Sequence, residues 1–136
     1  MNYLLQAIWT KISGSALSAD VGGRVYLDRA GKGAVFPYVV FFIVSGSPEK
    51  TFTEHYANTL IQFSLFSTSE SAAEITDMYA DLKTLFDECS LTITGSSLVW
   101  MKEQNLTTMV EDITDTQAGE AVKHWAVDFE VLTSLS

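Results

Sequence analysis

The chain has 136 residues, 47% of them hydrophobic, and carries eight Lys and Arg against seventeen Asp and Glu, a formal net charge of −9. This size and apolar content predict one domain over residues 1–136 and exclude an intrinsically disordered chain. The negative charge disfavours a surface that binds nucleic-acid phosphates. Cys89 is the single cysteine, which fits a reducing compartment, and residues 39–44, the strongest apolar run, are too short to cross a membrane.

An amphipathic helix is predicted over Asn2–Ile12. Its apolar residues recur at steps of three and four, which places them on one helix face: Leu4, Leu5, Ile8, Trp9 and Ile12. Residues 15–20 can add a short helical turn. Gly22 and Gly23 tolerate positive φ and introduce a brief strand at residues 24–27.

Two strands follow in the middle of the chain. Residues 28–35 have the composition of a loop, and Pro37 then opens an apolar strand over residues 38–45, which we expect to be central and buried. A polar connection over residues 45–54 leads to a strand in which Ile61, Phe63 and Leu65 alternate with polar residues. That alternation predicts one buried and one solvated face.

The second long helix has the clearest start signal. Two capping patterns, Ser67 with Glu70 and Ser71 with Glu74, precede a helical apolar stripe. The stripe comprises Ile75, Met78, Tyr79, Leu82, Leu85 and Phe86.

The remaining segments predict strands over residues 91–94, 98–108 and 121–133, with Gly95-Ser96 as a tight connection. Trp125, Val127, Phe129 and Val131 then share one face of the last strand. The fold class expected is α+β: a mostly antiparallel sheet of about five to six strands, with two helices packed on it and antiparallel neighbours wherever connections are short.

No combination of residues predicts catalysis or a cofactor. His55 and His124 have no second ligand at a metal spacing, and Cys89 follows a helix instead of preceding one, so nothing lowers its pKa. The three tryptophans, Trp9, Trp100 and Trp125, fall on apolar faces and are expected in the core. We therefore expect no enzyme, no metal and no cofactor.

Four acidic residues, Glu111, Asp112, Asp115 and Glu120, lie in a polar insert of ten residues between the late strands. Their spacing does not match a calcium loop, so a solvated surface is the simpler interpretation. The alternative is electrostatic, because acidic groups repel DNA phosphates and could line a passage through which DNA slides.

The stretch VGGRVYLDRAGKGAVFPYVVF, followed by NTLIQFSLFSTS and SAAEITDMYADLKTLFD, resembles the tail completion family of long-tailed bacteriophages, also called tail terminators. The resemblance continues through SLTITGSSLVWMKEQNLTTMVED and ends in HWAVDFEVLTS. It spans nearly the whole chain. The family pattern is matched at positions with an expected structural role: Gly22, Gly23, Arg24, Tyr26, Phe36, Pro37 and Tyr38.

This resemblance implies a structural, non-enzymatic subunit that forms a ring, expected to be a hexamer. The ring would cap the finished tail tube, end its polymerisation and provide the head-joining surface. The implied partners are other copies of the chain, the tail tube protein and a head–tail connector or neck protein, with DNA passing through without specific binding and no membrane contact. The implied location is the tail–neck region of a virion assembled in the bacterial cytoplasm.

A closed ring needs a heterologous interface, for which sheet edges and long loops are suitable. We expect this interface on the loops at residues 45–54 and 111–120, the longest polar inserts between strands. The candidate interface residues are Pro48, Glu49, Lys50, Glu54, Glu111, Asp112, Asp115 and Glu120.

Two other functions stay open at this stage. One is another phage neck or minor tail component, since small α+β subunits of necks resemble one another. The other, from a different class, is a small-molecule binding module or minor enzyme with Tyr26, Tyr38, His55 and His124 around a pocket between helices and sheet.

Overall fold

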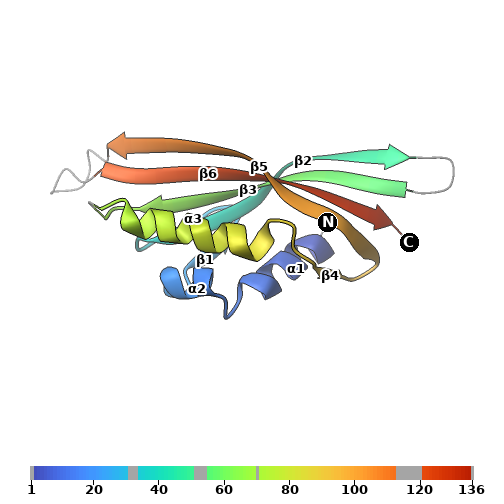
Figure 1. Cartoon of the computed structure of the whole chain (residues 1–136), viewed down its shortest axis with the longest axis horizontal. Helices are drawn as coiled ribbons and strands as arrows, with labels where there is room; N and C mark the ends of the chain where they lie inside the picture. The colour runs from blue at the N-terminus through green and yellow to red at the C-terminus, as the bar shows by residue number, and fades with distance from the viewer. Residues whose placement is uncertain (1, 31–33, 51–54, 70, 113–120, 136) are drawn as a thin grey trace.

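The structure is a computed structural model and describes residues 2–30, 34–50, 55–69, 71–112 and 121–135. Three helices lie on one face of a long six-stranded sheet (Figure 1). In chain order the elements are α1 (Asn2–Ile12), α2 (Ala16–Asp20), β1 (Val25–Leu27), β2 (Tyr38–Lys50), β3 (His55–Ser67), α3 (Ala73–Phe86), β4 (Thr92–Ile93), β5 (Ser96–Asp112) and β6 (Ala121–Leu135).

The sheet order is β1-β2-β3-β6-β5-β4. Its β1–β2 pair is parallel and the other pairs are antiparallel, so the predicted α+β class holds with a mixed sheet. The expectation that every short connection joins antiparallel strands is wrong at β1–β2. A parallel partner must begin at the same end of the sheet as β1. Because β1 has only three residues and is about 10 Å long, the ten residues between β1 and β2 are enough to bring the chain back to that end.

The N-terminal third forms the elements expected from its sequence. Helix α1 has the predicted bounds, and the Oγ of Ser15 caps α2 by accepting a hydrogen bond from the Ser18 N–H. Gly22 and Gly23 both take positive φ, at 58° and 78°, and the Gly23 N–H donates to the Ser18 carbonyl at 2.9 Å. The two glycines therefore reverse the chain between α2 and β1.

Arg24 connects the two halves of the family-like stretch. Its Nε donates to the Pro37 carbonyl at 3.0 Å, and its own carbonyl accepts from the Val39 N–H at 3.1 Å. Strand β1 is thereby held at the start of β2. This contact gives Arg24 and Pro37 the structural role that the sequence predicted.

Four phenylalanines fill the centre of the core between the sheet and α3. The ring of Phe63 lies 5.8 Å from Phe41, 5.0 Å from Phe86 and 5.5 Å from Phe129, centroid to centroid, and all four side chains are fully buried. Val127 and Val131 are buried on the same face of β6, as predicted. Helix α3 is thus held against the sheet by close aromatic packing.

Two strands extend well beyond their predicted ends. Strand β2 continues to Lys50 instead of ending at residue 45, and β5 continues to Asp112 instead of residue 108. Residues 45–50 pair with residues 55–60, and residues 109–112 pair with residues 121–124. Both faces of these strand ends lie beyond the helices (Figure 1), so the usual alternation of apolar and polar residues is not needed there.

The start of α3 also differs. Ser67 belongs to β3, and its hydroxyl donates to the Glu74 carboxylate at 2.6 Å. The N-cap residue is Ala72, which has no side chain that could cap the helix. The Ser71 hydroxyl accepts a hydrogen bond from the N–H of Ala73, the first residue of the helix. Ser67 is thus a strand residue and Ala72, not Ser71, takes the N-cap position, so neither serine caps α3 as predicted; Glu70 lies outside the described residues.

Candidate functional site

Two hairpin arms project from opposite ends of the sheet, beyond the layer of helices (Figure 1). The first, here the β2–β3 arm, comprises residues 43–50 and 55–61. The second, the β5–β6 arm, comprises residues 104–112 and 121–128.

The predicted interface residues fall on these arms or on the connections that join their strands. Pro48, Glu49 and Lys50 end strand β2, and Glu111 and Asp112 end strand β5. Residues predicted to be in loops are therefore in paired strands. The other candidates, Glu54, Asp115 and Glu120, lie outside the described residues.

The outer edges of both arms are open. Strand β1 pairs only with residues 39–41 of β2, and β4 pairs only with residues 96–97 of β5. Further along β5, the Met101 carbonyl accepts from the Glu88 N–H and the Glu103 N–H donates to Asp87. Beyond residues 41 and 103, no described segment pairs with the outer side of β2 or β5.

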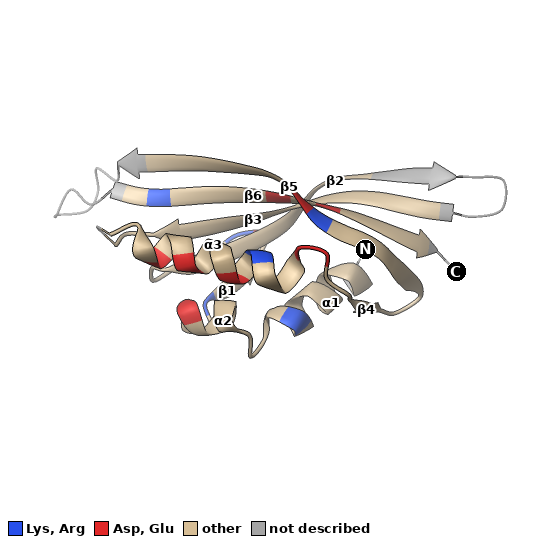
Figure 2. Cartoon of the chain, viewed as in Figure 1, with Lys and Arg blue, Asp and Glu red and all other residues tan. Residues whose placement is uncertain are grey.

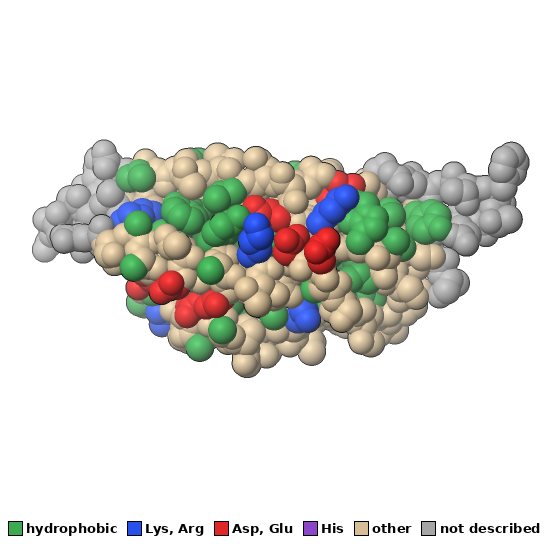
Figure 3. All heavy atoms as spheres, in the orientation of Figure 1, with side chains coloured by type: hydrophobic (Ala, Val, Ile, Leu, Met, Phe, Trp, Pro, Cys, Tyr) green, Lys and Arg blue, Asp and Glu red, His purple; other side chains and the backbone are tan. Residues whose placement is uncertain are grey.

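Apolar side chains accompany these open edges. Val110 is 67% exposed on the β5–β6 arm, and Val44 is exposed at the β-bulge of β2; Val99 is exposed at a bulge of β5 that precedes the open edge. Figure 3 shows two groups of hydrophobic side chains on one side of the molecule, separated by charged ones. Open backbone beside exposed apolar groups is typical of a surface that another chain covers.

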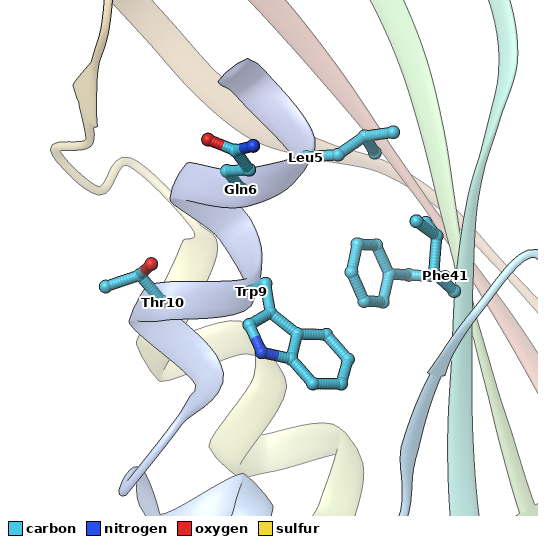
Figure 4. A pocket seen from close by; sticks show the side chains of 6 residues that line it. Leu5, Gln6, Trp9, Thr10 and Phe41 are labelled. Atoms are coloured by element: carbon cyan, nitrogen blue, oxygen red, sulfur yellow. The ribbon is translucent and has the colours of Figure 1, made fainter. Parts of the chain in front are cut away.

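A separate apolar groove lies between α1 and the β1–β2 side of the sheet. It has a volume of about 430 Å³, and Leu5 and Trp9 point from α1 toward Phe41 (Figure 4). Trp9 is 45% exposed, so its predicted place in the core is wrong. Its ring lies 6.1 Å from that of Phe41, at the rim of the core.

The other two tryptophans are half-buried. Trp125 packs against the core and makes an edge contact with Tyr79 at 5.9 Å. Trp100 has the Lys102 ammonium 4.2 Å above its ring. The sequence alone does not separate these three environments.

An aromatic row crosses the sheet face that the helices leave uncovered. Tyr26 contacts Tyr38, Tyr38 stacks on Phe66 at 4.8 Å, and Phe66 stacks on His124 at 4.3 Å. Tyr38, Phe66 and His124 of this row line a groove of about 380 Å³.

The predicted pocket between helices and sheet is therefore wrong in position. Tyr26, Tyr38 and His124 lie on the opposite sheet face, because successive side chains of a strand point to opposite faces. His55 does not join them. It begins β3, eleven residues before Phe66 and roughly 35 Å away along the strand.

The uncovered face has a polar half on β5 and β6. The Glu130 carboxylate accepts hydrogen bonds from the side-chain amides of Asn58, at 2.9 Å, and Gln104. Burial raises the pKa of Asp128, and a hydrogen bond from Asn105 opposes that shift. These contacts hold neighbouring strands together and place no acid–base pair around a cavity.

The remaining candidates of the sequence analysis are the cysteine, a metal site and a membrane span. Burial raises the pKa of the Cys89 thiol, whose sulfur lies 3.9 Å from that of Met101. Within the described ranges, no three His, Cys, Asp or Glu residues are grouped as a metal site would require. None of the helices that the structure describes is long and apolar enough to span a membrane.

Acidic residues gather where α2 meets α3 (Figure 2). Burial, a hydrogen bond to Asp81 and the charges of Asp81 and Asp77 raise the pKa of Asp20 to about 6. The folded state therefore binds this proton more tightly than the unfolded state does. The protonated carboxyl contributes to stability below about pH 4, and that contribution is lost as pH rises through about 6.

We expect Asp20→Asn to stabilise the protein by about 1 kcal/mol at pH 7, after allowing for solvent screening, and by almost nothing at pH 4. Urea unfolding at the two pH values measures the difference. Asp77→Asn, at an exposed position, is the control and should have a smaller effect. Equal stabilisation at both pH values would contradict the assignment.

The family model described as tail completion protein gp17 matches residues 6–134. Among solved structures, a chain from the virion of a native gene transfer agent particle has a TM-score of 0.79 at 17% sequence identity, covering 98% of this chain and 96% of that chain. Another solved chain has a TM-score of 0.54 at 12% identity, covering 96% of this chain and 94% of that one. Both show a shared fold. No curated protein matches the sequence.

Proposed function

The chain belongs to the tail completion protein gp17 family, and from this membership we propose that it is a structural component of a phage or prophage tail that caps the tail tube. Copies form a ring, a hexamer, on the last ring of the tube and end its polymerisation. The opposite side of the ring then provides the surface that joins the head. The protein is assembled in the bacterial cytoplasm and stays in the tail–neck region of the virion.

The observation that carries this proposal is the pair of arms with open edges at opposite ends of one sheet. A subunit with two different contact surfaces on opposite sides assembles head to tail, and such contacts produce a ring when the rotation closes. The similar fold of a chain found in a gene transfer agent virion supports the same placement.

The charge of the chain agrees with DNA passing through the ring. A net charge of −9 per subunit is repeated in every copy of the ring. Negative walls repel phosphates, so the DNA can slide without binding. The arrangement needs no catalytic residue.

The test is to mix the purified protein with tail tubes and image the tube ends by electron microscopy. We expect a ring-shaped cap on one end and no further growth when tube protein is added. Tubes incubated without the protein are the control. Tubes that stay uncapped and continue to elongate would overturn the proposal.

A further inference from the structure

We propose that neighbouring subunits join by strand pairing: the open edge of β5, residues 104–112, pairs with the open edge of β2, residues 43–50, in the next copy. The contact is then a continuation of the sheet, made largely of backbone hydrogen bonds. This inference rests on the proposed ring and specifies the surface that forms it.

The direction of the strands permits this pairing. From β2 to β3, β3 to β6 and β6 to β5 each neighbour is antiparallel, so β2 and β5 run in opposite directions within one sheet. A second copy in the same orientation therefore presents β2 antiparallel to β5. The two open edges also match in length, at eight and nine residues.

Hydrogen bonds at the inner end of β5 identify the backbone groups that point outward. The Met101 carbonyl and the Glu103 N–H both bond to the segment after α3, so they point away from β6. A bulge follows, after which Asn105 pairs with Asp128 of β6. The N–H and C=O groups of successive residues in a strand point to opposite edges. Asn105 points toward β6, so the residues whose backbone groups point outward are Leu106, Thr108 and Val110.

The same reasoning applies to β2. The Val39 N–H and the Phe41 carbonyl bond to the β1 side, and a bulge lies between Ile43 and Ser45. The outward residues of this edge are therefore Gly46, Pro48 and Lys50. Pro48 has no N–H, so the ladder lacks one donor there, while its carbonyl can still accept a bond.

The chain itself is the best-matched occupant of the β5 edge. Residues 106–110, LTTMV, are uncharged, contain no proline and favour extended structure, so nothing in them opposes pairing. An open edge of this kind promotes uncontrolled association unless a partner covers it. Head-to-tail pairing around a closed ring covers every such edge.

Cysteine cross-linking tests the contact in the full chain. In a Cys89→Ser background, Gly46→Cys and Val110→Cys place one thiol on each edge, and a short bismaleimide joins thiols that lie close together. The reaction is run on the protein in solution and on protein bound to tail tubes. We expect a ladder of covalent oligomers from the double variant and none from either single variant.

A backbone variant provides an independent measurement. Thr108→Pro removes an outward N–H of the exposed edge strand and leaves the bonds to β6 in place. We expect self-association, followed by native mass spectrometry, to weaken about tenfold or more. Thr108→Ala keeps the N–H and should associate like the parent. Circular dichroism checks that both variants stay folded.

The outcomes separate this inference from the proposed function. If tubes are capped but the double variant gives no ladder, or if folded Thr108→Pro associates normally, strand pairing is wrong while capping stands. A covalent dimer from Val110→Cys alone would also overturn it, since β5 would then pair with itself. If the chain neither associates nor binds tubes, both proposals fail.

Discussion

Replacing Phe63 by alanine is expected to destabilise the protein by about 4 kcal/mol, the largest effect predicted for a single substitution here. Its fully buried ring contacts Phe41, Phe86 and Phe129, so its loss opens a cavity where sheet and α3 meet. Surrounding rings cannot collapse into that space, since each is held by its own strand or helix. Urea unfolding followed by circular dichroism measures the change.

Phe66→Ala is the matched control, in the same strand with its side chain on the opposite face. Phe66 is half-buried and stacks between Tyr38 and His124. We expect it to lose only about 1 kcal/mol, because solvent can refill the site. Equal losses in the two variants would mean that the uncovered face contributes as much to stability as the core.

Replacing Glu103 by alanine is expected to cost about 2 kcal/mol. The Tyr79 hydroxyl lies 2.8 and 3.0 Å from the two carboxylate oxygens of Glu103, which joins α3 to β5. The substitution leaves that half-buried hydroxyl without its acceptor. Lys83 is 3.8 Å from the same carboxylate but half exposed, so this ion pair contributes little.

A double-mutant cycle with Tyr79→Phe isolates the hydrogen bond. Once Tyr79→Phe is present, Glu103→Ala should cost clearly less than it does alone; full additivity would contradict the assignment. Titration of the phenol gives a second measurement. Burial, a hydrogen bond to Glu103 and its charge raise the pKa of Tyr79 to about 12, so Glu103→Gln should lower it toward 10.

Elements with a buried stripe could be predicted from the sequence. Helix α1 has the expected bounds because its apolar spacing is regular up to Ile12. The face shared by Val127, Phe129 and Val131 follows from simple alternation. Where one side of an element packs on the core, burial imposes a period that the sequence displays.

The arms could not be predicted, because their ends lie beyond the helix layer and no helix imposes a period on them (Figure 1). Residues 45–50, with glycine, proline and two charges, have the composition of a loop, yet they pair along their whole length with residues 55–60. Their conformation depends on a partner strand, a long-range contact that local composition does not record. Five of the predicted interface residues therefore lie on strand ends where the sequence predicted loops, and their role in an interface stays a prediction.

The place of β6 in the sheet also determines when the protein can fold. This late segment lies between β3 and β5, and it is what joins the β1-β2-β3 half of the sheet to the β5-β4 half. A growing polypeptide that has reached residue 120 contains all three helices and five of the six strands, but its sheet is still in two separate parts. The core therefore closes only after residues 121–135 have left the ribosome. A chain that ends before residue 121 is expected to stay unfolded and to be degraded, and not to enter a particle as a shorter subunit.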